Sequence, residues 1–284
     1  MVQVVNSIQE MQSILREKRQ DGVTVGFVPT MGALHEGHGS LVDASKQECD
    51  MTIVSIFVNL KQFAAGEDFD TYPRLPEKDV AFLDKRKVDY VFLPTDKEIY
   101  PEHFATTIKM AGPAIGLESE ARPHFFHGVA TIVTKLFMII FPNIAYFGEK
   151  DYQQLCVIKR FTEDLSLPII IKGVPTKREK DGLAMSSRNL YLSSDKRKVA
   201  VNLHKALDNA AQNIMAGIPT EKACLDAKTF LLKNGFQKVD YIEVRAKETL
   251  VKSPLGEEPR ILGAATLDGT RLIDNIAVKR KPNA

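Results

Sequence analysis

Residues 27–38 read FVPTMGALHEGH, and this stretch decides the fold class. The apolar run that leads into it, residues 23–29, is short and continuous, as in a buried strand, and residues 39–48 have the pattern of a helix. Gly32 and Gly37 lie in the turn between the two. In an open α/β sheet, ligands bind where a strand ends and the next helix begins. The stretch therefore predicts a strand, a ligand-binding turn and a helix.

The same alternation continues through the first part of the chain. We expect strands and helices in turn: strands over residues 51–59, 89–93, 144–147 and 168–173, and helices over residues 77–87, 127–140 and 152–164. Strands that alternate with helices form parallel sheets with crossover helices. We therefore predict a parallel-sheet domain over residues 1–176.

The pattern changes after residue 176. We expect helices over residues 194–216 and 221–234, a strand over residues 239–244, and a hairpin whose strands, 261–266 and 270–278, are joined by Leu267, Asp268 and Gly269. This order predicts a smaller α+β domain with an antiparallel sheet over residues 177–284.

The composition excludes several classes of protein. A chain of 284 residues is long for one hydrophobic core and sufficient for two domains. Its 38 basic residues nearly cancel its 36 acidic ones, so we expect no nucleic-acid partner. Cys49, Cys156 and Cys224 are too widely spaced to indicate a disulfide framework or a zinc site. No apolar run resembles a signal peptide or a membrane span, and we expect a cytoplasmic protein.

The turn before the helix has the chemistry of a phosphate site. Gly32 and Gly37 allow the backbone to approach a ligand closely, and a helix N-terminus offers unpaired N–H groups to phosphate oxygens. His35 and His38 add hydrogen-bond donors. From these residues alone two alternatives stay open: the histidines lie in an ordinary surface loop, or they bind a metal ion with ligands that the spacing does not identify.

The HxGH spacing after a strand resembles the ATP-binding signature of nucleotidylyltransferases and class I aminoacyl-tRNA synthetases. The longer string PTMGALHEGH, residues 29–38, is similar to that of pantothenate synthetases. Five further segments agree with that family, in the same order: NLKQF (59–63), RP (122–123), FGEKDYQQ (147–154), DGLAMSSRN (181–189) and GTRLIDN (269–275). Because these matches span nearly the whole chain, it is identified as a member of this family.

The resemblance implies a fold and an activity. The fold is α/β, with a Rossmann-like N-terminal domain and a smaller α+β C-terminal domain that acts as a lid. The activity is the ATP-dependent ligation of pantoate and β-alanine through pantoyl-adenylate, with release of AMP and pyrophosphate. Mg²⁺ is expected, bound mainly through ATP phosphates, and a homodimer through the first domain. The alternatives are a nucleotidylyltransferase acting on a phosphorylated acceptor, a tRNA-charging enzyme and a nucleotide-binding sensor.

The resemblance also implies site residues. Those expected at ATP are Thr30, Met31, Gly32, Ala33, Leu34, His35, Glu36, Gly37, His38, Gly148, Glu149, Lys150, Asp151, Lys177, Met185, Ser186, Ser187 and Arg188. Catalytic roles fall to His35, His38, Lys150, Ser186, Ser187 and Arg188, since donors and cations there would stabilise charge on the departing pyrophosphate. Asp151 is expected to orient either Mg²⁺ or the ribose. Pantoate is expected at Gln62 and Gln154, with β-alanine near Gln62 and with Asn59, Tyr72 and Arg122 as secondary candidates.

Three positions depart from the family pattern. Leu60 replaces a proline, which removes a fixed φ from that loop. Phe125 stands where a histidine is usual, and neither His124 nor His127 beside it is assigned a role. Lys177 replaces an apolar residue near the adenine, which need not matter if that contact is made by backbone atoms.

Overall fold

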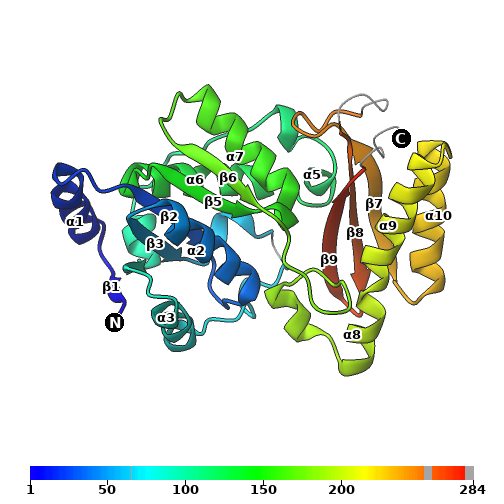
Figure 1. The fold of residues 1–284 in the computed structure, drawn as a ribbon, viewed down its shortest axis with the longest axis horizontal. Helices are drawn as coiled ribbons and strands as arrows, with labels where there is room; N and C mark the ends of the chain where they lie inside the picture. Colours follow the sequence, from blue (N-terminus) through cyan, green and yellow to red (C-terminus); the bar gives the residue numbers. More distant parts are fainter. Residues whose placement is uncertain (65, 253–257, 279–284) are drawn as a thin grey trace.

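The computed structural model describes residues 1–64, 66–252 and 258–278 (Figure 1). A six-stranded sheet has the order β1-β4-β3-β2-β5-β6, and all its pairings are parallel. Its strands are β1 (Gln3–Val5), β2 (Val25–Thr30), β3 (Met51–Ile56), β4 (Tyr90–Phe92), β5 (Ile144–Gly148) and β6 (Ile170–Val174). The parallel sheet predicted from the sequence is confirmed.

Helices cover both faces of this sheet. They are α1 (Ile8–Gln20), α2 (Glu36–Glu48), α3 (Pro76–Lys85), α6 (Phe125–Ile140) and α7 (Tyr152–Asp164), with short helices α4 (Asp96–Ile99) and α5 (Glu118–Ala121). Neighbouring strand residues face opposite sides: Phe27 packs with α1, α6 and α7, whereas Val28 packs with α2 and α3. Because both faces of the central strands β2 and β3 are buried, these strands are predominantly apolar.

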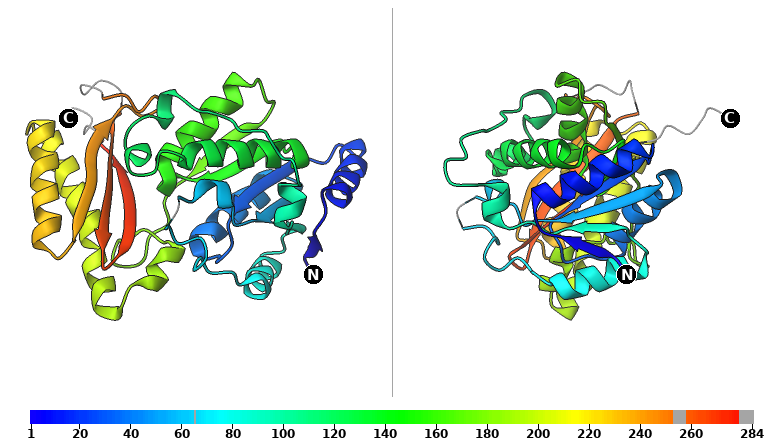
Figure 2. Two further views of the ribbon diagram at one scale, coloured as in Figure 1. Left: turned by 180° about the vertical axis from the view of Figure 1, so that it is seen from behind. Right: turned by 90° about the vertical axis from the view of Figure 1, so that its left-hand side faces the viewer.

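A second sheet contains β7 (Lys238–Arg245), β8 (Arg260–Leu267) and β9 (Thr270–Ala277), all antiparallel. Helices α9 (Asn202–Met215) and α10 (Thr220–Lys233) cover its outer face, so the sheet lies between them and the first part of the chain (Figures 1 and 2). The predicted hairpin is confirmed, with Asp268 and Gly269 as its loop. Both loop residues have positive φ, as the tight turn requires.

The structure differs from expectation at several elements. The helix expected over residues 194–216 is divided at Val201 into α8 (Ser194–Ala200) and α9. The ψ of Val201 is −20°, away from the α-helical value of about −42°, and Ala200 and Leu203 on either side of it are both buried in the core of the second sheet. Strand β1 and helix α1 had no prediction, although Ser7 and Glu10 form the S-x-x-E spacing of a helix start, and the Ser7 hydroxyl accepts from the Glu10 N–H.

Within the described ranges, no helix combines the length and apolar character needed to cross a membrane.

Candidate functional site

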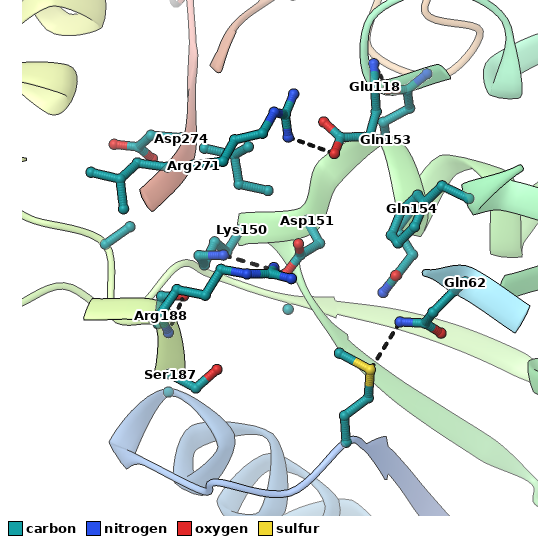
Figure 3. A pocket seen from close by; sticks show the side chains of 18 of the residues that line it. Gln62, Glu118, Lys150, Asp151, Gln153, Gln154, Ser187, Arg188, Arg271 and Asp274 are labelled. Atoms are coloured by element: carbon teal, nitrogen blue, oxygen red, sulfur yellow. Dashed lines mark hydrogen bonds and ion pairs between the residues drawn. The ribbon is translucent and has the colours of Figure 1, made fainter. Parts of the chain in front are cut away.

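One cavity of about 950 Å³ lies where the two sheets meet (Figure 3). Its lining begins at the carboxyl ends of β2 and β5, which are neighbours in the large sheet. The chain order reverses there, since β3 and β4 continue on one side of β2 while β5 and β6 continue on the other. Such a reversal leaves a crevice between the loops that follow the two strands. The cavity therefore occupies the position where open α/β sheets bind ligands.

The turn after β2 is held from behind by a buried carboxylate. Gly32 and Ala33 both have positive φ, at 83° and 50°. Asp79 of α3 accepts hydrogen bonds from the N–H groups of Ala33 at 2.9 Å and Leu34 at 2.8 Å. These bonds satisfy donors that the irregular backbone leaves without secondary-structure partners. The fold thereby fixes the position of His35, the residue that caps the start of α2.

Two histidines cap that helix. Nδ1 of His35 accepts from the Gly37 N–H at 3.0 Å, and Nδ1 of His38 accepts from the His35 N–H at 3.3 Å. Burial lowers the pKa of His35 to about 4, helped by the positive charge of Lys150. Burial, then His35 and Lys150, lower the pKa of His38 to about 3. Both rings are therefore neutral at neutral pH, and with Nδ1 accepting, each carries its proton on Nε2.

The segment after β5 provides a cation. A single turn, η3 (Glu149–Asp151), follows the strand and leads directly into α7. Lys150 and Asp151 line the cavity, with their charged groups 3.8 Å apart. Neighbouring Glu149 is turned to Arg260, whose Nη2 lies 2.9 Å from its carboxylate. Lys150 thus presents an ammonium group to the cavity that also contains the two histidines.

The Met185–Arg188 segment closes the cavity from the other sheet's side. The Met185 N–H donates to the Lys177 carbonyl at 3.0 Å. Lys177 therefore holds this segment in place through its backbone. Arg188 pairs with Asp68 through two hydrogen bonds of 3.0 and 2.9 Å. The Tyr72 and Ser187 hydroxyls lie 3.2 Å apart. Burial raises the pKa of Asp68 and Arg188 lowers it, with a net lowering that keeps the carboxylate charged.

Amide side chains form the remaining wall. Asn59 donates to the Gln62 side-chain oxygen at 3.0 Å and accepts from the Tyr100 hydroxyl at 2.6 Å. The Arg122 guanidinium donates to the Gln62 carbonyl at 3.1 Å and also binds Glu67. Gln62 and Gln154 lie on the same side of the cavity (Figure 3). The two glutamines offer neutral donors and acceptors beside the charged segments.

The cavity brings together most of the residues singled out from the sequence. Those that line it are Thr30, Met31, His35, Gly37, His38, Asn59, Gln62, Tyr72, Arg122, Gly148, Lys150, Asp151, Gln154, Lys177, Met185, Ser186, Ser187 and Arg188. Five others, all described, lie outside its lining: Gly32, Ala33, Leu34, Glu36 and Glu149. Gly32 and Ala33 shape the turn, and Leu34 packs against the core. Glu36 pairs with Arg86 at 2.7 Å. A direct role for these five at ATP stays a prediction.

Sequence reasoning missed several residues that organise the cavity. Asp79, Asp68, Glu118 and Arg271 had no assigned role, although Arg271 lies in the GTRLIDN segment. An acidic residue in the first turn of a helix, like Asp79, is a common feature and does not reveal a partner 45 residues away.

The departures from the family pattern have local explanations. The turn η1 (Leu60–Gln62) forms without proline, with the Asn59–Gln62 bond across it. The Arg122 guanidinium lies over the ring of Phe125, with its Cζ atom 4.1 Å from the ring centroid. His127 accepts the Met110 N–H at 3.1 Å and so ties a loop to α6.

Comparison with known proteins identifies the family. The family model described as pantoate-beta-alanine ligase matches residues 3–277. The chain belongs to this family. The match to the pantoate-beta-alanine ligase family includes all the motifs whose residues meet in the cavity.

Individual relatives agree over their full lengths. The chain is 47% identical to the pantothenate synthetase of Hyphomonas neptunium, over 98% of this chain and 97% of that protein. It is 48% identical to that of Mesorhizobium japonicum, over 97% and 98%. A crystal structure of pantothenate synthetase from Thermus thermophilus has a TM-score of 0.92 at 41% identity, covering 98% and 99% of the two chains. A pantoate-beta-alanine ligase from Francisella tularensis, complexed with beta-gamma ATP and beta-alanine, has a TM-score of 0.83 at 35% identity and 98% coverage of both.

Most carboxylates that line the ligase cavity are paired with arginines and are not free to bind a metal ion. Across the described residues, no group of three or more His, Cys, Asp or Glu side chains is placed to hold one. Asp151 contributes a carboxylate to the lining, beside Lys150. This donor set fits an ion that takes most of its oxygen ligands from a bound triphosphate.

Proposed function

We propose that this chain joins pantoate to β-alanine with ATP, through a pantoyl-adenylate. The observation that supports this most directly is the meeting of three segments in one cavity: the two histidines after β2, Lys150 after β5, and Met185–Arg188. Their donors and cations suit a triphosphate, and the glutamines beside them suit a hydroxy acid. Family membership supports the same substrate pair.

In the first step, a carboxylate oxygen of pantoate attacks the α-phosphorus of ATP. The bond to the bridging oxygen breaks, and pyrophosphate leaves with the electron pair. The Nε2–H groups of His35 and His38 donate to oxygens that gain charge, and the Lys150 ammonium neutralises them. Neutral histidines donate here without adding to the positive charge of Lys150. His38, through its Nε2–H, is proposed to be the main hydrogen-bond donor to the departing pyrophosphate.

In the second step, the neutral amine of β-alanine attacks the carbonyl carbon of the adenylate. The bond from that carbon to the phosphate oxygen breaks, AMP leaves with the electron pair, and the extra proton on the new amide nitrogen passes to solvent. Gln62 and Gln154 are proposed to bind pantoate throughout both steps. Asn59 donates to the Gln62 side chain and Arg122 to the Gln62 backbone carbonyl, so we assign Asn59 to holding that side chain and Arg122 to holding the turn that carries it.

Mg²⁺ is proposed to bind mainly through phosphate oxygens, with Asp151 as its protein ligand or as a partner of the ribose. When bound, the ion would neutralise charge on the triphosphate.

We further propose a domain boundary at residue 176, a lid role for the second domain, a homodimer through the first domain, and a cytoplasmic location. Sedimentation of the purified protein tests the dimer.

The test is product analysis with ATP, Mg²⁺, pantoate and β-alanine, omitting each acid in turn. We expect AMP, pyrophosphate and pantothenate in equal amounts only when both acids are present. AMP transfer to a phosphorylated acceptor without pantoate would instead support a nucleotidylyltransferase. ATP binding without turnover would support a sensor.

A further inference from the structure

Asp274 and Asn275 are consecutive, buried residues of β9 that reach different parts of the cavity wall. They are 4% and 3% exposed. Consecutive side chains of a strand face opposite sides of the sheet. One side chain therefore binds the segment leading to Met185–Arg188, and the other binds the turn that carries Lys150. The GTRLIDN segment that contains them has no role in the mechanism described so far.

Asn275 holds the Lys150 turn through its side-chain amide. Its Nδ2 donates to the Glu149 and Lys150 carbonyls, both at 2.9 Å. Its Oδ1 accepts from Nε of Arg260 at 2.6 Å. The two N–H bonds of one amide thus fix two successive carbonyls of η3. An aspartate here would place an anionic oxygen against those carbonyls and lose both donors.

Asp274 holds the other segment through Arg178. The two side chains pair through bonds of 2.7 and 2.9 Å, and Arg178 also donates to the Gly182 carbonyl at 3.0 Å. Residues 178 and 184 form a bridge at the base of the loop that enters Met185–Arg188. A bidentate pair with a buried carboxylate fixes orientation as well as distance. The Asn275 backbone N–H also donates to the Asp274 carboxylate at 2.8 Å. The contact with Arg178 and the contact with the Lys150 turn are therefore made from one short, hydrogen-bonded piece of β9.

We propose that Asp274 and Asn275 are a positioning pair that sets the separation between Lys150 and Met185–Arg188, so that both contact the same triphosphate. The pair does not take part in the chemistry. This inference rests on the proposed roles of Lys150 and Arg188 at ATP. It requires that loss of Asn275 act through Lys150, which distinguishes positioning from a general contribution to stability.

The experiment is a double-mutant cycle on pantoate-dependent exchange of pyrophosphate into ATP. The variants are Asn275→Ala, Lys150→Ala and the two combined, with Asn275→Asp as an isosteric replacement should the alanine variant fail to fold. The control is Gln237→Ala, which removes an amide that accepts from the Gly269 N–H at 3.0 Å at the hairpin end of the same sheet. Thermal unfolding of each variant checks the fold.

We expect Asn275→Ala and Asn275→Asp to slow maximal exchange by about 10- to 100-fold, since small displacements of a contacting group have effects of that size. In the Lys150→Ala background the further loss should be under about 3-fold, because residues that act as a unit are not additive. Gln237→Ala should exchange normally. If the double variant lost the product of the two single losses, or if either Asn275 variant exchanged normally, the positioning inference would be overturned but the proposed function would stand. Normal exchange by Lys150→Ala would overturn the proposed role of Lys150 and the inference with it.

Discussion

The carboxylate of Asp79 supports two backbone N–H groups in a turn where Ala33 has a positive φ. Asp79→Ala leaves both buried donors unpaired, and each such group costs about 1–3 kcal/mol. We expect a loss of unfolding free energy of that order in urea titrations, together with slower adenylation, because the turn precedes His35. Glu77→Ala, exposed in the first turn of the same helix, is the control. Unchanged stability in Asp79→Ala would contradict the assigned role.

The lowered pKa of His38, about 3, makes stability depend on pH. In the unfolded chain a histidine titrates near its ordinary pKa of about 6.5. Between these values the unfolded chain binds more protons than the folded one, so acidification favours unfolding. We expect the unfolding free energy to fall less steeply from about pH 6.5 to pH 4 in His38→Gln than in the unchanged protein. Above about pH 7.5 the difference between the two should be constant; parallel curves throughout would refute the assigned pKa.

At the scale of elements, helix α6 and turn η1 approach closely at Gly128. A Cβ there would lie 2.1 Å from the Lys61 carbonyl oxygen and 2.7 Å from the Gln62 nitrogen. Helix propensity alone favours alanine over glycine by about 1 kcal/mol, but a contact this short forces the backbone apart. We expect Gly128→Ala to raise the KM for pantoate more than the KM for ATP, because the turn carries Gln62. Met138→Ala, exposed on the same helix, should change neither KM.

The elements predicted best from the sequence are those whose environment is uniform. Strands β2 and β3 are buried on both faces, so their apolar runs predict them directly. The three-residue strand β1 is too short to show a period, and no proline or glycine near Val201 indicates the division between α8 and α9. In the site, local motifs predict which segments line the cavity. Partners such as Arg188 with Asp68, 120 residues apart, depend on the packing of the two sheets.

At the scale of the whole molecule, an ion pair of Arg271 joins the second sheet to helix α5 in the first part of the chain. Arg271 of β9 binds Glu118 of α5 at 2.6 Å and Asp240 of β7 at 2.7 Å. Without it, the proposed lid should open more often and admit water to the adenylate. We expect Arg271→Ala to release more AMP than pantothenate when both acids are supplied. Lys222→Ala, which breaks an exposed pair within α10, is the control. Equal amounts of the two products in Arg271→Ala would refute this role.

The central claim is that one cavity first makes an adenylate of pantoate and only then uses β-alanine. The most direct measurement is the exchange of labelled pyrophosphate into ATP with Mg²⁺ and pantoate, in the absence of β-alanine. The account predicts exchange that requires pantoate and is strongly reduced in His38→Ala, Lys150→Ala and Gln154→Ala variants that remain folded. Exchange that is absent until β-alanine is added, or that proceeds equally without pantoate, would contradict it.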